Sequence, residues 1–254
     1  MTGDATRNGT GPQRTGREPM ARPLPKRFYE NALAGPVEGG FGVLLDGRAA
    51  RTPAKRLLTV ASPDLAEVIA AEWAAQTTTI DPATMPLTRI VIAAVDGVAG
   101  NERAVAEDIV AFAGSDLVCY RAAAPSGLVA AQSAHWDPVL AWAEGRLHAR
   151  MRLAEGVMHV AQDAAALDAV RRHLVGRDAL ALAALHVMTT LTGSALIALA
   201  HADGAMDVAA AWAAAHVDED WQISQWGEDG EARARRARRW LDMQAASRIA
   251  ALTG

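Results

Sequence analysis

The sequence pattern of this chain changes along its length, from one typical of β strands to one typical of helices. Over residues 28–60, short apolar runs alternate with turn signals, among them an Asp46-Gly47 pair of the kind that closes tight β hairpins. Further along, the chain is rich in alanine, leucine and arginine and is patterned as helix almost throughout. The sequence therefore predicts an α+β fold. A small N-terminal domain with antiparallel β hairpins plus helices (residues 26–98) precedes a larger all-helical C-terminal domain (residues 99–254).

The first 25 residues are rich in Gly, Thr, Arg and Pro and lack an apolar run long enough for a signal peptide. We expect residues 1–25 to form a disordered tail. The single cysteine, Cys119, can close no internal disulfide and can build no multi-cysteine zinc site, which fits a reducing cytoplasmic compartment. Its apolar neighbours predict a small buried side chain rather than a reactive thiol.

Bulk charge and hydropathy exclude two classes of partner. The formal net charge of -4 gives no overall attraction to nucleic acid or to anionic lipid, so we expect no nucleic-acid partner. Residues 179–200 are long enough to span a bilayer, but they are mostly alanine, include His186 and have no aromatic belt. We expect a buried helix there and no membrane insertion. Gly193 and Ser194 either admit a closely packed neighbour or mark a break between two shorter helices.

A helix is predicted to start at Ser62-Pro63-Asp64 and to end near Gln76, because Ser, Pro and Asp favour a helix N-terminus. Its apolar stripe includes Glu72 and Trp73. A carboxylate in such a stripe has two explanations. Either Glu72 forms an internal ion pair with an arginine such as Arg89 on the next helix, or Glu72 or Arg89 contacts a partner directly.

A second mixed stripe lies near the C-terminus, on a helix predicted to begin near Asp207. One narrow sector of that helix contains two tryptophans and two polar residues, in the order Val208, Trp212, Ala215, Glu219, Gln222 and Trp226. Burying an unpaired carboxylate costs several kcal/mol, on the order of the net stability of a domain. Glu219 is therefore either paired inside the protein or placed to reach a partner.

Gly227 is predicted to end this helix, and three acids are predicted to open the next, where negative charge suits the helix dipole: Glu228, Asp229 and Glu231. Five arginines follow between Arg233 and Arg239. The acids lie directly upstream, and Trp240 is the one aromatic residue beside the run, so a solvated helix face with intrahelical ion pairs is favoured over a nucleic-acid patch.

Motifs for catalysis are missing. The chain has no P-loop, no G-x-G-x-x-G turn, no G-x-S-x-G elbow and no H-E-x-x-H pair. His216, Asp218, Glu219 and Asp220 are possible metal ligands, but their spacing does not aim three of them at one point. We therefore expect no catalytic residue, no metal, no cofactor and no enzymatic activity. The alternatives are a small-molecule enzyme that uses the acidic cluster over residues 216–229, or a general holdase.

Several segments together resemble one protein family. They are KRFYENA, LLDGRAARTPAKRLLTV, LAEVIAAEWAAQ, MPLTRIVIAAVDGV, DLVCYRA, QSAHWDPVLAW, LTGSALIALA and DEDWQISQWGEDGEA. In this order, and from about Lys26 onward, they resemble the assembly chaperones of the F-type ATP synthase alpha subunit, the ATP-twelve family. Composition and the lack of an import sequence look like a bacterial cytoplasmic member, whereas eukaryotic relatives work in the mitochondrial matrix.

The resemblance implies a two-part protein that acts without turnover. Such a chaperone binds the free ATP synthase alpha subunit, shields the surface destined for the beta subunit, and leaves when beta arrives. We expect a monomer. The family pattern implies partner-binding roles for four residues of the C-terminal stripe, and two are added from the N-terminal segments; together they are Glu219, Gln222, Trp226, Glu228, Trp73 and Arg89.

Overall fold

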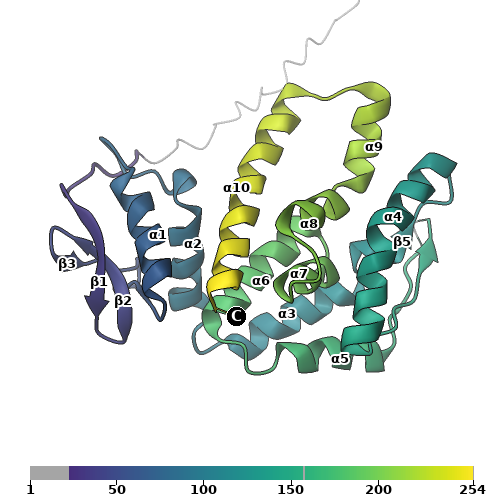
Figure 1. The fold of residues 1–254 in the computed structure, drawn as a ribbon, viewed down its shortest axis with the longest axis horizontal. Coiled ribbons are helices and arrows are strands. Elements are labelled where there is room, and N and C mark those ends of the chain that lie inside the picture. The colour runs from purple at the N-terminus through teal and green to yellow at the C-terminus, as the bar shows by residue number, and fades with distance from the viewer. Residues whose placement is uncertain (1–22, 157, 254) are drawn as a thin grey trace, which may run out of the picture.

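The computed structural model describes residues 23–156 and 158–253. A small β sheet and two helices stand at one end, and a larger group of helices forms the rest of the molecule (Figure 1). This is the predicted α+β architecture. Residues 1–22 of the expected tail lie outside the described residues, and the carbonyl of Pro25 accepts a hydrogen bond from the Ile80 amide at 2.9 Å.

The N-terminal sheet is antiparallel and is built on one central strand. Strand β2 pairs on one side with β1 and on the other with β3 and β4. The bounds are β1 Ala32–Val37, β2 Gly40–Leu45, β3 Arg48–Ala49 and β4 Thr59–Val60. Asp46 and Gly47 connect β2 to β3 with φ angles of 48° and 80°. Positive φ at both central residues is the geometry of a tight hairpin turn, so this prediction is confirmed.

One helix covers the sheet, and a second packs behind it. Helix α1 (Pro63–Ala74) starts as predicted, with the Ser62 hydroxyl accepting a hydrogen bond from the Leu65 amide. It packs on β1 and β2 and contacts α2 (Pro86–Ala93), which continues into a π-helical turn over Ala94–Val98.

The predicted ion pair between Glu72 and Arg89 is wrong. The Glu72 carboxylate accepts hydrogen bonds from the amides of Leu87 and Thr88, each at 2.8 Å, and from the Thr88 hydroxyl at 2.8 Å. It thus caps the N-terminus of α2, where unpaired amides and the helix dipole favour an anion. Burial nonetheless raises the pKa of Glu72, and these hydrogen bonds oppose the rise. Arg89 pairs instead with Asp242.

The C-terminal part is mostly helical. Its helices are α3 Glu102–Gly114, α4 Ser126–Trp142, α5 Ala164–Leu174, α6 Ala179–Thr192, α7 Ala195–Ala202, α8 Val208–Ala215, α9 Val217–Trp226 and α10 Gly230–Thr253. A short parallel pair of strands, β5 Tyr120–Arg121 and β6 Ala154–Glu155, interrupts the helical pattern. Pairs of two residues are too short to leave an alternating pattern in the sequence.

Helices α6 and α7 form the centre of this part, and they show why residues 179–200 are so apolar. Gly193 lies between them with φ 67°, the left-handed conformation that ends a helix, and the Ser194 hydroxyl caps α7 by accepting from the Ile197 amide at 2.9 Å. The segment is therefore two buried helices, as one of the two sequence interpretations had it. Within the described residues, no helix is both long and apolar enough to cross a membrane.

The two parts of the molecule meet along α2. This helix contacts both α6 and α10, and the ion pair between Arg89 and Asp242 joins α2 to α10. The lower half of α10 is thus packed against both parts. Its upper half rises beyond the helical core and turns over into α9 (Figure 1).

Candidate functional site

The predicted single helix from Asp207 to Trp226 is wrong: the structure has two helices, α8 and α9, with a break at His216. The backbone of His216 leaves the helical region, with φ -119° and ψ 18°. Its Nδ1 donates to the Trp212 carbonyl at 2.7 Å, and its ring stacks on Trp212 at a centroid distance of 3.9 Å. The break divides the mixed stripe, so that Trp212 faces Trp240 while the residues after His216 belong to a separate helix.

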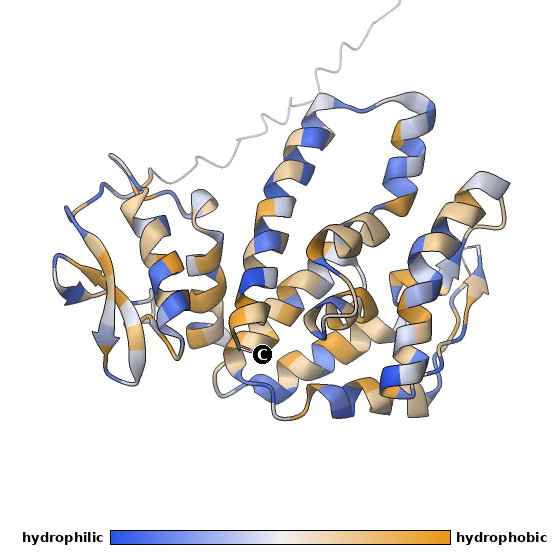
Figure 2. Cartoon of the chain, in the orientation of Figure 1, coloured by the Kyte–Doolittle hydropathy of each residue, from blue (hydrophilic) through white to orange (hydrophobic). Residues whose placement is uncertain are grey.

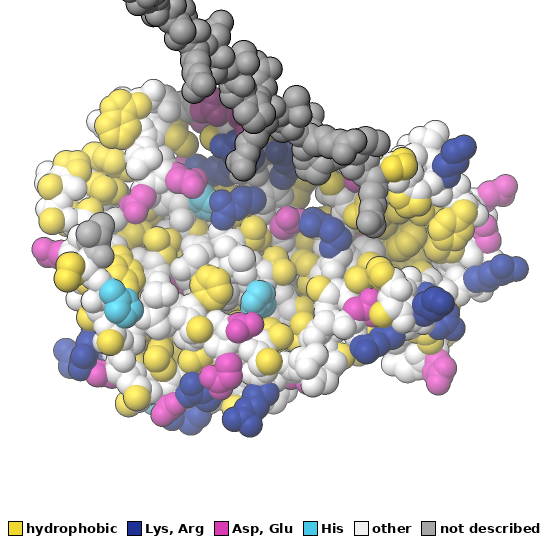
Figure 3. Space-filling model, turned by 180° about the vertical axis from the view of Figure 1, so that it is seen from behind, with side chains coloured by type: hydrophobic (Ala, Val, Ile, Leu, Met, Phe, Trp, Pro, Cys, Tyr) yellow, Lys and Arg dark blue, Asp and Glu magenta, His cyan; other side chains and the backbone are white. Residues whose placement is uncertain are grey.

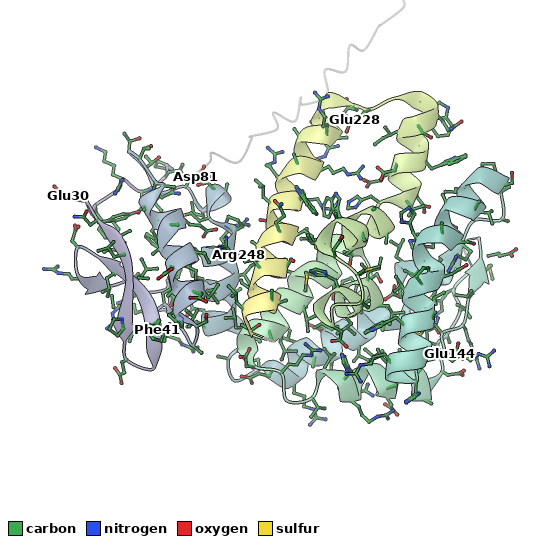
Figure 4. All side chains as sticks on the ribbon, viewed as in Figure 1. Glu30, Phe41, Asp81, Glu144, Glu228 and Arg248 are labelled. Atoms are coloured by element: carbon green, nitrogen blue, oxygen red, sulfur yellow. The ribbon has the colours of Figure 1, made fainter. Side chains whose placement is uncertain are left out.

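Helices α9 and α10 form a hairpin at the top of the molecule. As predicted, α9 ends at Trp226 and is followed by Gly227, whose φ is 85°. The Asp229 carboxylate then accepts a hydrogen bond from the Ala232 amide at 2.9 Å and caps the start of α10. Glu228 lies at the tip of this hairpin (Figure 4).

A cleft of about 470 Å³ lies between the two helices. It is lined by Glu219, Gln222, Ile223, Trp226, Gly227, Glu228, Asp229, Ala232, Arg235, Arg236 and Arg239. Four of the six residues predicted to bind a partner are among them: Glu219, Gln222, Trp226 and Glu228. The structure therefore brings these four side chains to one concave surface.

Trp226 is the most unusual residue of this surface, because 79% of it is exposed to solvent. A side chain of this size normally buries most of its area. The surrounding hairpin is strongly hydrophilic, in contrast to the apolar helices below it (Figure 2). Trp226 is thus a large apolar side chain within a polar rim.

Glu219 is neither buried nor tightly paired inside the protein. Its side chain is 56% exposed, and its nearest cationic contact is the His216 ring, at 4.0 Å. Burial lowers the pKa of His216. The neutral ring therefore dominates at pH 7, and no Lys or Arg of residues 23–156 and 158–253 lies within 4.0 Å of the Glu219 carboxylate on the wall of the cleft.

The arginine run supports the hairpin in more than one way. Arg235 makes an intrahelical pair with Glu231 at 2.6 Å, as the sequence predicted for this face, and Arg233 lies 3.8 Å from Glu228. Arg236 instead crosses to Asp220 on α9, and this hydrogen bond raises the pKa of the Arg236 guanidinium. On the rear face of the molecule, basic and acidic side chains lie next to one another near the top (Figure 3).

The two other predicted site residues lie outside this cleft. Arg89 lines a separate, largely apolar groove of about 350 Å³ between α2, α6 and α10, where it pairs with Asp242. Trp73 lies on α1 and packs against Tyr29 at a centroid distance of 5.8 Å, with part of its surface exposed. Its buried Nε1 has no hydrogen-bond partner among the described residues.

The acids near His216 do not converge on a metal ion. Asp218 accepts a hydrogen bond from Gln132 on α4 at 2.7 Å, whereas Asp220 faces Arg236 on α10. No group of three or more His, Cys, Asp or Glu side chains in residues 23–156 and 158–253 could hold a metal ion. Asp218 and Asp220 thus connect α9 to its neighbouring helices.

Sequence reasoning missed the residues that hold α9 in place, namely Gln132, Trp221 and the Asp220–Arg236 pair. Trp221 packs on Gly127, at the start of α4. Contacts of this kind depend on which helices become neighbours, and no local pattern in the sequence predicts that. The one available signal was Trp221 itself, a second tryptophan on α9 that lies off the predicted stripe.

Comparisons with known proteins agree with this architecture. The sequence profile of the ATP12 chaperone protein family matches residues 26–144. This is the ATP-twelve family that the sequence segments resemble. The Atu1473 protein of Agrobacterium tumefaciens, described as a candidate chaperone, is 50% identical. That match covers 92% of this chain and 88% of the other, with a TM-score of 0.87. Atp12 from Paracoccus denitrificans is 40% identical over 91% of this chain and 99% of its own, with a TM-score of 0.83. A mutant of the same Paracoccus protein gives the same identity and TM-score.

Proposed function

The chain belongs to the ATP12 chaperone family, whose members are ATP synthase assembly factors, and from this premise we propose that it binds the free alpha subunit of the F-type ATP synthase. In this proposal the chaperone shields the surface of alpha that later contacts the beta subunit, and beta displaces it during assembly of the catalytic head. It acts by binding alone, as a monomer in the bacterial cytoplasm, without a cofactor.

The observation that carries the proposal is the exposure of Trp226 at a cleft that also contains Glu219, Gln222 and Glu228. Tryptophan offers a large, rigid contact area and is among the residues that dominate binding energy at protein interfaces. An exposed apolar side chain at a concave surface is a mark of an interaction site. Trp226 can therefore replace, for a time, apolar contacts that the beta subunit makes in the finished complex.

The polar residues of the cleft supply selectivity in this proposal. Within the described part of the chain no Lys or Arg pairs with the Glu219 carboxylate, and Arg233 contacts Glu228 only at the longer distance of 3.8 Å. Charged groups around an apolar contact orient a partner and penalise wrong partners. This arrangement favours one defined subunit over the many unfolded clients of a general holdase.

Arg89 forms a second part of the proposed contact, because its side chain is 43% exposed at the groove between α2, α6 and α10. Trp73 is better explained by packing. It is half-buried, its backbone carbonyl accepts a hydrogen bond from the Tyr29 hydroxyl at 2.7 Å, and it lies outside the cleft.

A charge reversal in the cleft tests the proposal. Glu228→Lys places a cation where the proposed contact presents a carboxylate, so we expect affinity for the alpha subunit to fall at least about tenfold, with the fold intact. Glu144→Lys is the control, because Glu144 is 64% exposed and lies far from the hairpin tip (Figure 4). Co-purification with alpha gives the readout, and circular dichroism verifies folding. Equal binding by wild type and a folded Glu228→Lys variant would refute this role of the cleft.

A further inference from the structure

Helix α9 forms one wall of the cleft and is flanked by non-helical backbone at both ends. His216 precedes it with φ -119°, and Gly227 follows it with φ 85°. Element ends that interrupt helical geometry are the positions where a chain can absorb a change of direction. The width of the cleft therefore depends on what holds α9 from the side.

On the face turned away from the cleft, α9 rests on α4. The Gln132 side chain is 2% exposed and uses both ends of its amide. Its Nε2 donates to Asp218 on α9 at 2.7 Å, and its Oε1 accepts from the Ala122 amide at 2.8 Å. A buried amide with both ends bonded has one favourable orientation, so it fixes the position of Asp218.

The second contact between α9 and α4 is tightly packed. Trp221 packs its ring directly over Gly127, in the first turn of α4. A methyl group added at Gly127 would lie 2.2 Å from Cη2 and 2.8 Å from Cζ3 of that ring. Because real carbon atoms do not approach so closely, the ring and the helix that carries it can sit at this depth only against a glycine.

We infer that Gly127 and Trp221 position α9 against α4 and so set the width of the cleft between α9 and α10. The Asp220–Arg236 pair connects the same helix to α10, so that α9 is held by α4 on one side and by α10 on the other. Trp221 is thus a positioning residue, which acts through its neighbours Gln222 and Ile223 on the cleft side of α9. The expected effect on affinity for the alpha subunit rests on the proposed function, whereas the expected effect on the width of the cleft does not.

The geometric consequence can be measured without a partner. Spin labels on Gln225→Cys and Ala234→Cys, both exposed, report the distance between α9 and α10. The natural Cys119 stays unlabelled, because it is fully buried and burial raises the pKa of its thiol to about 12. We expect Gly127→Ala to shift or broaden this distance by about 1 Å or more, a displacement large enough to affect a preorganised site. We expect the double variant Gly127→Ala, Trp221→Leu to return it toward wild type.

Gly145→Ala is the matched control, since a methyl group there meets no atom within 4 Å. Affinity for the alpha subunit, measured on the same proteins, should fall at least about fivefold for Gly127→Ala and recover in the double variant. Thermal denaturation of the same variants shows whether Gly127→Ala also destabilises the fold. A loss of affinity caused by instability alone would not be accompanied by a changed distance between the spin labels.

Two results would count against different claims. An unchanged label distance in Gly127→Ala would overturn the inference, because Trp221 would then have rotated aside without moving α9. An altered distance, with no alpha binding by any of the variants or by wild type, would leave the positioning role intact and refute the proposed function.

Discussion

At the scale of single residues, Trp226 and Asp116 show two opposite departures from the usual distribution of side chains. Trp226 is 79% exposed although it is large and mostly apolar, whereas Asp116 is fully buried although it is acidic. The exposure of Trp226 to solvent is explained if a partner covers it in a complex. Hydrogen bonds inside the protein offset only part of the cost of burying Asp116.

Trp226→Ala tests the first explanation. Because the side chain makes few contacts within the chain, its removal should leave thermal stability nearly unchanged. Affinity for the alpha subunit should fall by about 2 kcal/mol or more, which is thirtyfold or so. Phe28→Ala, at a residue 72% exposed on the N-terminal part, is the control and should not affect binding. Isothermal titration calorimetry measures both variants, and equal affinities would contradict the role of Trp226.

The buried Asp116 connects the segment after α3 to the start of α7. Its Oδ1 accepts from the Val118 amide at 3.3 Å and its Oδ2 from the Leu196 amide at 3.0 Å. Burial outweighs these hydrogen bonds and raises the pKa of Asp116 to about 6, from an ordinary value of 3.8. A folded-state pKa above the unfolded one means that the folded protein holds this proton more tightly.

The stability that Asp116 contributes is therefore fully present below pH 3.8 and is lost as the pH rises through about 6. Asp116→Asn cannot titrate, so its free energy of unfolding relative to wild type should rise between pH 4.5 and 7.5 by about 2 kcal/mol. Asp46→Asn is the control. Backbone hydrogen bonds lower the pKa of Asp46, so its contribution changes only below pH 3.8. Urea denaturation at several pH values gives the comparison, and parallel pH profiles for wild type and Asp116→Asn would contradict the assignment.

At the scale of elements, the break between α6 and α7 depends on one backbone conformation. Gly193 has φ 67°, and a methyl group there would meet no atom within 4 Å. Gly193→Ala should thus destabilise the protein only through the left-handed backbone, by about 1 kcal/mol. Gly145→Ala, also in open space but without a positive φ, is the matched control. Thermal denaturation distinguishes the two, and an equally stable Gly193→Ala would show that the break tolerates another conformation.

The sequence predicted the elements whose signals are local. The turn at Asp46-Gly47, the cap at Ser62 and the end of α9 at Gly227 each follow from one or two residues with strong backbone preferences, whereas the break at Gly193 was one of two interpretations. The break at His216 was not predictable in this way. The segment around it contains no Gly or Pro, and in the structure the His216 ring packs on Trp212, four residues upstream.

The role of Glu72 was missed for a related reason. Its place in an apolar stripe indicated an internal partner, but an arginine and a helix N-terminus satisfy a carboxylate equally well. The choice between them depends on how α1 and α2 meet, and the structure places the amides of Leu87 and Thr88 in reach. Periodicity alone cannot predict such a contact.

At the scale of the whole molecule, the candidate site was predictable where it is built from one continuous segment. Glu219, Gln222, Trp226 and Glu228 come together because one hairpin carries all four. Arg89 and Trp73 come from another part of the chain, and their distance from the cleft is a consequence of how α2 packs on α6 and α10. The contacts that hold α9 against α4 likewise depend on how the helices pack and not on a local sequence pattern.

Co-expression with the cognate alpha subunit in the absence of beta tests whether this chain binds that one subunit. We expect size-exclusion chromatography of the clarified lysate to yield a stoichiometric complex, which dissociates when beta is added. Aggregated alpha with the chaperone eluting alone, or a complex that beta cannot displace, would contradict it.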